Sequence, residues 1–182
     1  MIMYASDFEE IPSALKNNIE LRNHIISLIK TKNIVGKVTE GAGRLEKFRV
    51  ILANLVNGQS TLAEAIATTN SELERYTSNY PDNNRVFAQG WAERLVRTQL
   101  SRFYNQSIME IELSKGITEC YVPPSRNEDP SSNCSQVLAG KSHDISHLLN
   151  LLVSSYENGV WGDNTPKIPD HPHCTHVVKP IS

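Results

Sequence analysis

Apolar residues recur every three or four positions through the first two-thirds of the chain, which is the spacing of an amphipathic helix. The first run predicts a helix over 13–30 and the second a helix over 43–56. A third helix is predicted to begin at Thr61, because Glu64 stands three residues later in a capping-box arrangement, and to end near residue 76. The pattern therefore predicts a series of consecutive helices in the first part of the chain.

The fourth predicted helix is the longest and covers 83–115. This stretch has no proline, its only internal glycine is Gly90, and Gly116 provides a C-cap. Its apolar residues lie on one face early in the helix and on another face later. Because a free coiled coil would keep a single seam, this pattern predicts a spine that other elements contact on different sides.

A polar strip follows the same helix. By the three-and-four spacing rule it contains Arg94, Thr98, Ser101, Arg102 and Asn105, with Arg97 beside it. One interpretation is a solvated face. The other is a buried or interfacial polar network, because guanidinium groups suit fixed bidentate contacts.

The composition changes near residue 116. All three cysteines, five of the six histidines and seven of the nine prolines lie beyond residue 119. Short strands are expected at 118–122, 136–138 and 177–178, with a helix over 142–156. The predicted fold class is α+β, mainly α, with a helical N-terminal part, one long spine helix and a small irregular Cys/His-rich C-terminal domain with short strands. The expected divisions are a helical arm (1–58), a helical region with the spine (59–116) and a small Cys/His loop domain, a candidate zinc knuckle (117–182).

Composition and charge exclude several classes of protein. The chain has 182 residues, of which 39% are hydrophobic, so it can build a core. No apolar run approaches the length of a membrane span, and the start lacks the features of a secretion signal. The net charge of -2 argues against a protein that mainly neutralises a DNA backbone. With only three cysteines, a disulfide scaffold is not expected.

Thiols and imidazoles near the C-terminus are candidate zinc ligands. Cys174 with His171 or His176 would supply one half of a site, and Cys134, forty residues earlier, would contribute to the other half. Cys120 and His173 are alternative candidate ligands. The alternative interpretation is that the histidines lie on the surface of a proline-rich tail and the cysteines are small buried hydrophobes.

The sequence signatures of catalysis are weaker than those of a zinc site. His143 and His147 are four residues apart and share a helix face, but the segment lacks the glutamate of the metalloprotease motif, which favours two solvent-facing histidines. The sequence contains no glycine-rich phosphate loop and no nucleophile elbow.

Three blocks, taken in order, carry a resemblance to a known family. The first block is Arg97-Thr98-Gln99 with Arg102, Tyr104-Asn105 and the helix end Lys115-Gly116-Ile117. The second is the segment from Asp129 through Cys134 to Gly140-Lys141. The third is the closing segment Ile168-Pro169-Asp170-His171-Pro172-His173-Cys174-Thr175-His176-Val177-Val178-Lys179-Pro180. Over about residues 50 to 182 the chain resembles the phage minor head proteins, also called head morphogenesis proteins, of the phage Mu F type. It departs from the family pattern at Gln99, Ser131 and His176, where the family usually has glutamate, cysteine and cysteine.

The resemblance implies roles for particular residues. It leaves Cys134, His171, Cys174 and His176 as a four-donor set for structural zinc. It also implies that the helical strip, with Arg97, Thr98, Arg102 and Asn105, forms a structural brace that holds the C-terminal loop domain on the long helix.

The resemblance further implies a non-enzymatic virion component of a tailed bacteriophage. Such a minor capsid protein lies in the capsid interior or at the portal vertex, and in the host cytoplasm during assembly. Its expected partners are the portal protein and the major capsid protein, and it aids head assembly and DNA packaging or delivery. Several copies per particle are possible, and contact with packaged DNA is the weaker expectation. The alternative is a zinc-dependent hydrolase or nuclease of phage origin that uses His143, His147, His171 and Cys174.

Overall fold

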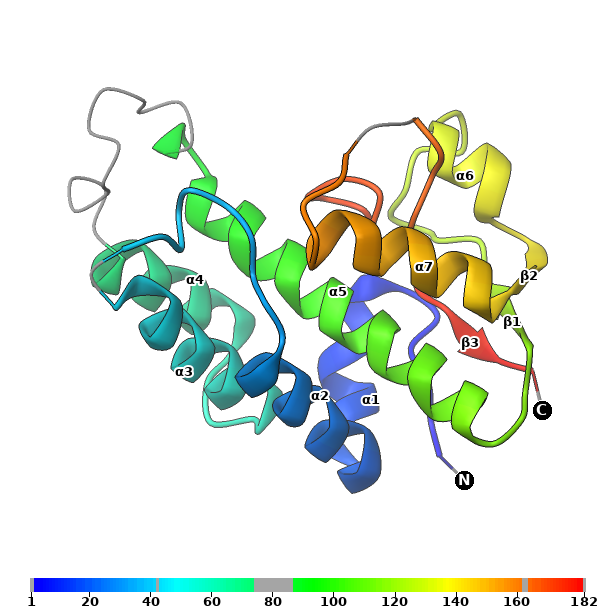
Figure 1. Cartoon of the computed structure of the whole chain (residues 1–182), viewed down its shortest axis with the longest axis horizontal. Helices are drawn as coiled ribbons and strands as arrows, with labels where there is room; N and C mark the ends of the chain where they lie inside the picture. The colour runs from blue at the N-terminus through cyan, green and yellow to red at the C-terminus, as the bar shows by residue number, and fades with distance from the viewer. Residues whose placement is uncertain (1, 42, 74–86, 162–163, 182) are drawn as a thin grey trace.

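The fold consists of helices arranged around one long helix, with a small sheet beside it (Figure 1). A computed structural model describes residues 2–41, 43–73, 87–161 and 164–181. In chain order the helices are a 3-10 turn (Phe8–Glu10), α1 (Ile11–Lys16), α2 (Ile19–Thr31), α3 (Arg44–Val56), α4 (Leu62–Glu72), α5 (Trp91–Ser114), α6 (Asn133–Leu138) and α7 (Ile145–Tyr156). Strands β1 (Glu119–Val122), β2 (Lys141–Asp144) and β3 (Lys179–Pro180) form an antiparallel sheet in the order β2-β1-β3. The predicted α+β, mainly α fold is confirmed.

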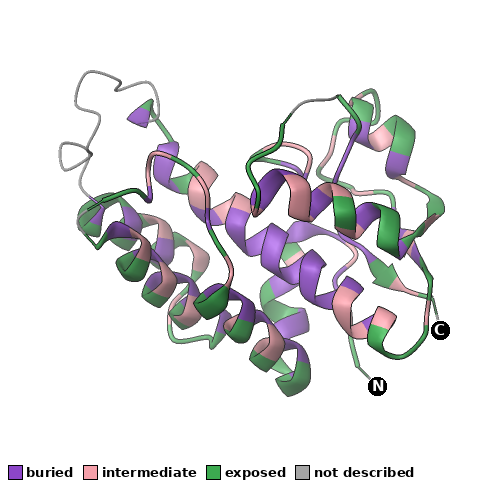
Figure 2. Ribbon diagram, in the orientation of Figure 1, coloured by how far each residue is buried: buried purple, intermediate pink, exposed green. Residues whose placement is uncertain are grey.

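Helix α5 is the spine. Helices α2 and α4 contact it, as do α7 and β3. Every residue from 99 to 109 is buried, so the middle of the helix is covered on all sides (Figure 2). The helix begins at Trp91 rather than at residue 83, because Gly90 has a left-handed φ of 79° and forms its N-cap. Residues 83–86 of the predicted helix lie outside the described residues.

The N-terminal helices differ from the sequence prediction at one point. The single helix expected over 13–30 is divided, because the Asn18 side chain accepts a hydrogen bond from the backbone N–H of Leu21 and starts α2 as a new helix. The capping box of Thr61 and Glu64 at the start of α4 is present as predicted. The expected end of that helix near residue 76 lies outside the described residues.

The C-terminal part contains three further corrections. The strand expected at 136–138 is part of helix α6, because Ser132 caps that helix by accepting a hydrogen bond from the backbone N–H of Ser135. The last strand lies at Lys179–Pro180, just after the expected 177–178. The helix expected over 142–156 begins at Ile145, since its first residues form β2.

Buried apolar side chains form one cluster that extends through both parts of the chain. It includes Phe8 and Phe48 of the N-terminal part and Leu152 and Val177 of the C-terminal part. The predicted domain boundaries at 58 and 116 therefore stay predictions, and one hydrophobic core extends across both of them. Among the described residues, none of the helices combines the length and the apolar character that crossing a membrane requires.

Candidate metal centre

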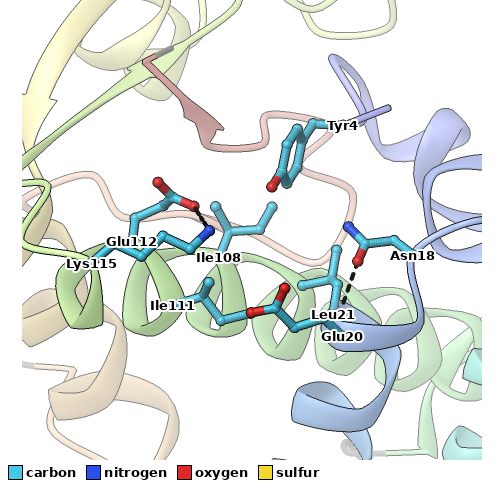
Figure 3. Close-up of a pocket in the computed structure, with 8 residues that line it drawn as sticks. All are labelled: Tyr4, Asn18, Glu20, Leu21, Ile108, Ile111, Glu112 and Lys115. Carbon is cyan, nitrogen blue, oxygen red and sulfur yellow. Dashed lines mark hydrogen bonds and ion pairs between the residues drawn. The ribbon is translucent and has the colours of Figure 1, made fainter. Parts of the chain in front are cut away.

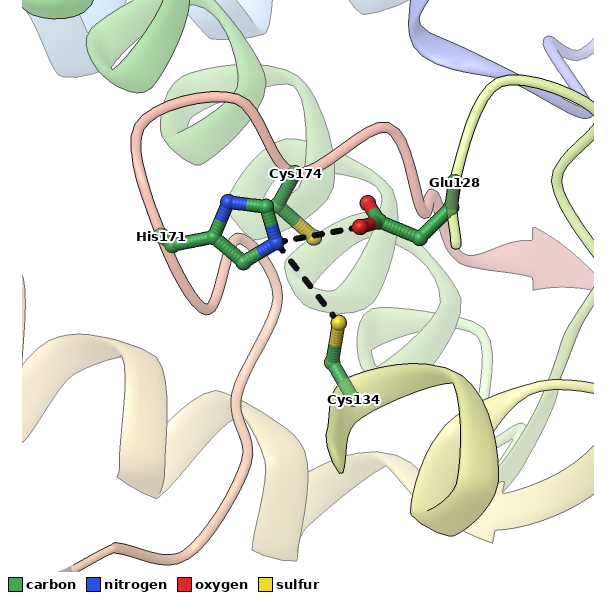
Figure 4. A group of neighbouring side chains, drawn as sticks. All are labelled: Glu128, Cys134, His171 and Cys174. Atoms are coloured by element: carbon green, nitrogen blue, oxygen red, sulfur yellow. Dashed lines mark hydrogen bonds and ion pairs between the residues drawn. The ribbon is translucent and has the colours of Figure 1, made fainter. Parts of the chain in front are cut away.

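Two loops that are distant in sequence bring four metal-binding groups together. They are the side chains of Glu128, Cys134, His171 and Cys174, whose ligand atoms all lie within 4.8 Å of one another (Figure 4). Glu128 and Cys134 come from the segment between β1 and β2, and His171 and Cys174 come from the tail after α7. The donor set is one carboxylate, two thiols and one imidazole.

Local hydrogen bonds fix the two loops. The Asp129 carboxylate accepts from the backbone N–H and the hydroxyl of Ser131, at 2.8 and 2.7 Å, which closes the turn before α6. The Ser132 cap then places Cys134 in the first turn of α6. In the tail, the backbone N–H of Cys174 donates to the His171 carbonyl at 3.0 Å, so both side chains face the same point.

The distances suit a tetrahedral ion. His171 Nε2 lies 3.2 Å from Glu128 Oε1 and 3.8 Å from Cys134 Sγ. Zinc binds nitrogen and oxygen at about 2.0–2.2 Å and sulfur at about 2.3 Å, which puts neighbouring ligand atoms about 3.5 Å apart. The residues present therefore fit a zinc ion after small adjustments of their side chains.

The two thiols of the group influence each other's pKa. A hydrogen bond from Cys174 lowers the pKa of Cys134, and the same bond together with burial raises the pKa of Cys174. A bound zinc ion would take both sulfurs as thiolates, because a metal competes with protons for its ligands.

Three of the four ligands predicted from the sequence lie in this group, and the fourth lies at its edge. His176 is fully buried, with Nδ1 3.7 Å from Cys174 Sγ and 3.9 Å from Glu128 Oε2. Its Nε2 lies 3.4 Å from the hydroxyl of Ser135 on α6. In this structure Glu128 takes the fourth position, and His176 packs against it.

Glu128 is the residue that sequence reasoning missed. It lies in a polar loop where several carboxylates and amides follow one another, so no spacing distinguishes it. Its Oε2 accepts hydrogen bonds from the backbone N–H and the hydroxyl of Thr175, at 3.0 and 3.4 Å. These bonds hold the carboxylate toward the thiols, and its side chain is only 8% exposed.

The other candidate residues lie outside the group. Cys120 is fully buried in β1, where burial raises the pKa of its thiol to about 11. His173 is exposed, and His147 is exposed on α7. His143 Nε2 lies 2.8 Å from the carbonyl of Leu138. The set His143, His147, His171 and Cys174 is therefore not assembled as one site among the described residues.

The polar strip of α5 is a network in its buried middle. The Asn105 side chain accepts a 2.8 Å hydrogen bond from the backbone N–H of Val178, and its amide donates to the Ser101 carbonyl at 2.7 Å. Asn105, which is fully buried, thus joins the C-terminal tail to the spine as predicted. Thr98, on the same strip, is half-buried.

The two arginines of the predicted brace face the N-terminal segments instead. The Arg102 guanidinium donates to the Asn33 carbonyl at 2.7 Å, and Arg97 lies 3.3 Å from the Glu9 carboxylate and over the Phe8 ring. The sequence prediction that they brace the C-terminal domain is corrected by these contacts. Long guanidinium side chains on a helix covered on all sides reach whichever segment passes over them.

Apart from the metal centre, a small hollow lies between the N-terminal segment, α2 and the end of α5 (Figure 3). Tyr4 faces into it, and the Glu112–Lys115 ion pair, with a separation of 3.0 Å, lies on the opposite side. Its volume of about 10 Å³ is close to that needed by a single water molecule. This hollow is too small for a substrate or cofactor.

Comparison with known proteins adds no relative. No protein-family model matches the chain, and no curated protein or solved structure gives a significant match.

Proposed function

We propose that this chain is a structural, non-enzymatic minor head protein of a tailed bacteriophage. The observation that supports the proposal best is the convergence of the three sequence blocks that carry the resemblance. Cys134 of the second block lies 3.8 Å from His171 of the third, and Asn105 of the first block accepts a hydrogen bond from Val178, which also belongs to the third. Segments that share a role in holding a module together are expected to meet in space.

The proposed cofactor is a structural zinc ion held by Glu128, Cys134, His171 and Cys174. Four protein ligands close a tetrahedral site, which is the arrangement of structural rather than catalytic zinc. The small tail has short strands and little secondary structure of its own, so a metal ion would supply stability that its limited core does not. His176, beside Glu128, would orient that carboxylate.

The second candidate function is a zinc-dependent hydrolase or nuclease. One observation favours it, since Glu128, a carboxylate of the kind that can act as a general base, lies among the candidate metal ligands. Both of its oxygens are already engaged, by His171 and by Thr175. We therefore rank this function below the structural one. Chelator-sensitive cleavage of DNA by the purified protein, lost in Glu128→Gln, would favour the enzyme.

The structural role is tested in the particle. An epitope-tagged copy of the chain is introduced into the phage that encodes it, and particles are purified on a density gradient. The proposal expects the tag in DNA-filled heads, together with cross-links to portal or major capsid protein. Recovery of the tag only in the soluble host fraction would refute the assignment. Partner surfaces, copy number and location in the head are then read from an electron-microscopy map.

A further inference from the structure

The two cysteine sulfur atoms of the metal centre also lie close enough to react with each other (Figure 4). Cys134 Sγ and Cys174 Sγ are within 4.8 Å and share a hydrogen bond, and both residues are free cysteines. A disulfide places its sulfur atoms about 2 Å apart, so the gap closes by a movement of at most about 3 Å. Cys174 lies in the tail between α7 and β3, outside any helix or strand, so this movement disrupts no regular element.

The surroundings of the two thiols differ. Cys134 Sγ lies 3.8 Å from Nε2 of His171, whose side chain is 39% exposed. Cys174 Sγ lies 3.7 Å from Nδ1 of His176, which is fully buried. Both cysteines are themselves buried, so an oxidant enters when the partly exposed His171 ring swings toward solvent. A small oxidant that takes this route meets Cys134 first, with Cys174 next to it as the thiol that completes a disulfide.

The third cysteine of the chain is held away from this pair. Cys120 is fully buried in β1 and is not one of the four residues whose ligand atoms converge. It lies opposite His143 of β2 and Pro180 of β3, so the sheet fixes its backbone on both sides. The fold therefore selects one of the three possible pairings of cysteines.

We propose that Cys134 and Cys174 are a redox-active pair, which a peroxide converts to a disulfide between α6 and the tail. A metal binds the thiolate form of cysteine, so the oxidised centre keeps only Glu128 and His171 as donors and releases its ion. The release of the ion rests on the proposed function, whereas the disulfide does not. A head protein leaves the reducing host cytoplasm in the particle, so the pair stays reduced during assembly and is oxidised afterwards.

The oxidation is balanced with hydrogen peroxide as the oxidant. The Cys134 sulfur attacks one peroxide oxygen, the O–O bond breaks, an S–O bond forms, and the leaving hydroxide takes up the thiol proton as water. The Cys174 sulfur then attacks the Cys134 sulfur, the S–S bond forms, and the S–O bond breaks. The hydroxide that leaves takes up the Cys174 proton as a second water. The two thiols lose two electrons and two protons, and the peroxide gains them.

The test adds hydrogen peroxide to the folded full-length protein, in one zinc-loaded sample and one chelator-treated sample. Trypsin separates the three cysteines, because it cleaves after Arg126 and Lys141. Mass spectrometry without reductant should find the Cys134 peptide joined to the Cys174 peptide, with the loss of two hydrogen atoms. In the zinc-loaded sample a chromophoric chelator should detect about one zinc ion released per disulfide. Cys120→Ala is the matched control and should form the same disulfide as wild type.

The peptide map of wild type locates the bond directly, so the result does not depend on whether Cys134→Ser folds. In guanidinium chloride the three thiols are equally accessible and should give mixed pairings. The same mixture from the folded protein would overturn the proposal, as would Cys134 and Cys174 that stay reduced or reach sulfinic acid unpaired, with and without metal. Protein that never holds zinc but forms this disulfide would contradict the zinc proposal alone and support the redox pair.

Discussion

At the scale of single residues, the structure and the sequence prediction differ in the fourth candidate metal ligand, which is Glu128 in the structure and His176 in the prediction. Cysteine and histidine stand out in the tail, whereas a glutamate in a polar loop does not. Three donors could therefore be predicted from residue type and spacing. Glu128 could not, because its position depends on hydrogen bonds from Thr175, which is 47 residues away.

The first prediction concerns this ligand. Glu128→Gln keeps the size of the side chain and an oxygen that accepts from Thr175, but it removes the negative charge. We expect zinc affinity to fall by about tenfold or more, measured by competition with a chromophoric chelator. Glu119→Gln, an exposed change in β1, is the control and should leave affinity unchanged.

His176→Gln tests whether His176, rather than Glu128, is the fourth ligand. If His176→Gln abolishes binding and Glu128→Gln leaves it intact, the set predicted from the sequence holds the metal and the set in the structure is wrong. The account expects the reverse order of effects. A smaller loss in His176→Gln is consistent with its contact to Glu128.

At the scale of elements, Asn105 joins the tail to the spine through one buried hydrogen bond. Asn105→Ala leaves the backbone N–H of Val178 buried without its partner. We expect a loss of about 1–3 kcal/mol in the free energy of unfolding, measured in urea on the metal-free protein. Asn54→Ala, on the exposed face of α3, is the control and should change stability little. A loss below about 0.5 kcal/mol in Asn105→Ala would contradict the role given to this bond.

The elements that the sequence predicted well are those whose signals are local. The capping box at Thr61 and the run around 43–56 each specify a helix within a few residues. The segment at 136–138 is apolar enough for a strand, but the Ser132 cap makes it helical. The partners of Arg97 and Arg102 were not predictable, because periodicity gives the face of a helix and not the segment that covers it.

At the scale of the whole molecule, the N-terminal segment is tied to the C-terminal module. The Ser125 hydroxyl donates to the Asp7 carboxylate, and Ser125 Oγ also lies 2.6 Å from Thr175 Oγ1. Burial raises the pKa of Asp7, but hydrogen bonds from Ser125 and from the backbone N–H of Glu9 outweigh it and lower the pKa below its usual value. The charged form of Asp7 therefore stabilises the fold.

This linkage predicts a pH dependence. The contribution of Asp7 is complete above the unfolded pKa of about 3.9 and is lost as the pH falls through the lower pKa of the folded state. We expect Asp7→Asn to cost about 1–2 kcal/mol near neutral pH. The difference between wild type and variant should shrink at about pH 3. Unfolding in urea, with chelator present throughout, measures both values. A difference that grows toward acid pH would contradict the proposed linkage.

Removal of the metal is expected to act on one part of the molecule. Chelation should increase amide hydrogen exchange in the loops around Glu128 and His171, which lack long helices of their own. Helices α2 and α3 pack against each other and are distant in sequence from the ligands, so amide exchange in these helices should remain slow. Equal acceleration in all helices would mean that the ion stabilises the whole fold rather than the tail.

The most direct measurement of the central claim is the metal content of the purified protein. Mass spectrometry of protein produced with zinc in the medium should find about one zinc ion per chain. Cys134→Ser should lose this zinc, while Cys120→Ala, which removes a buried thiol outside the site, should keep it. Wild-type protein without metal, or Cys134→Ser with a full complement of zinc, would contradict the account.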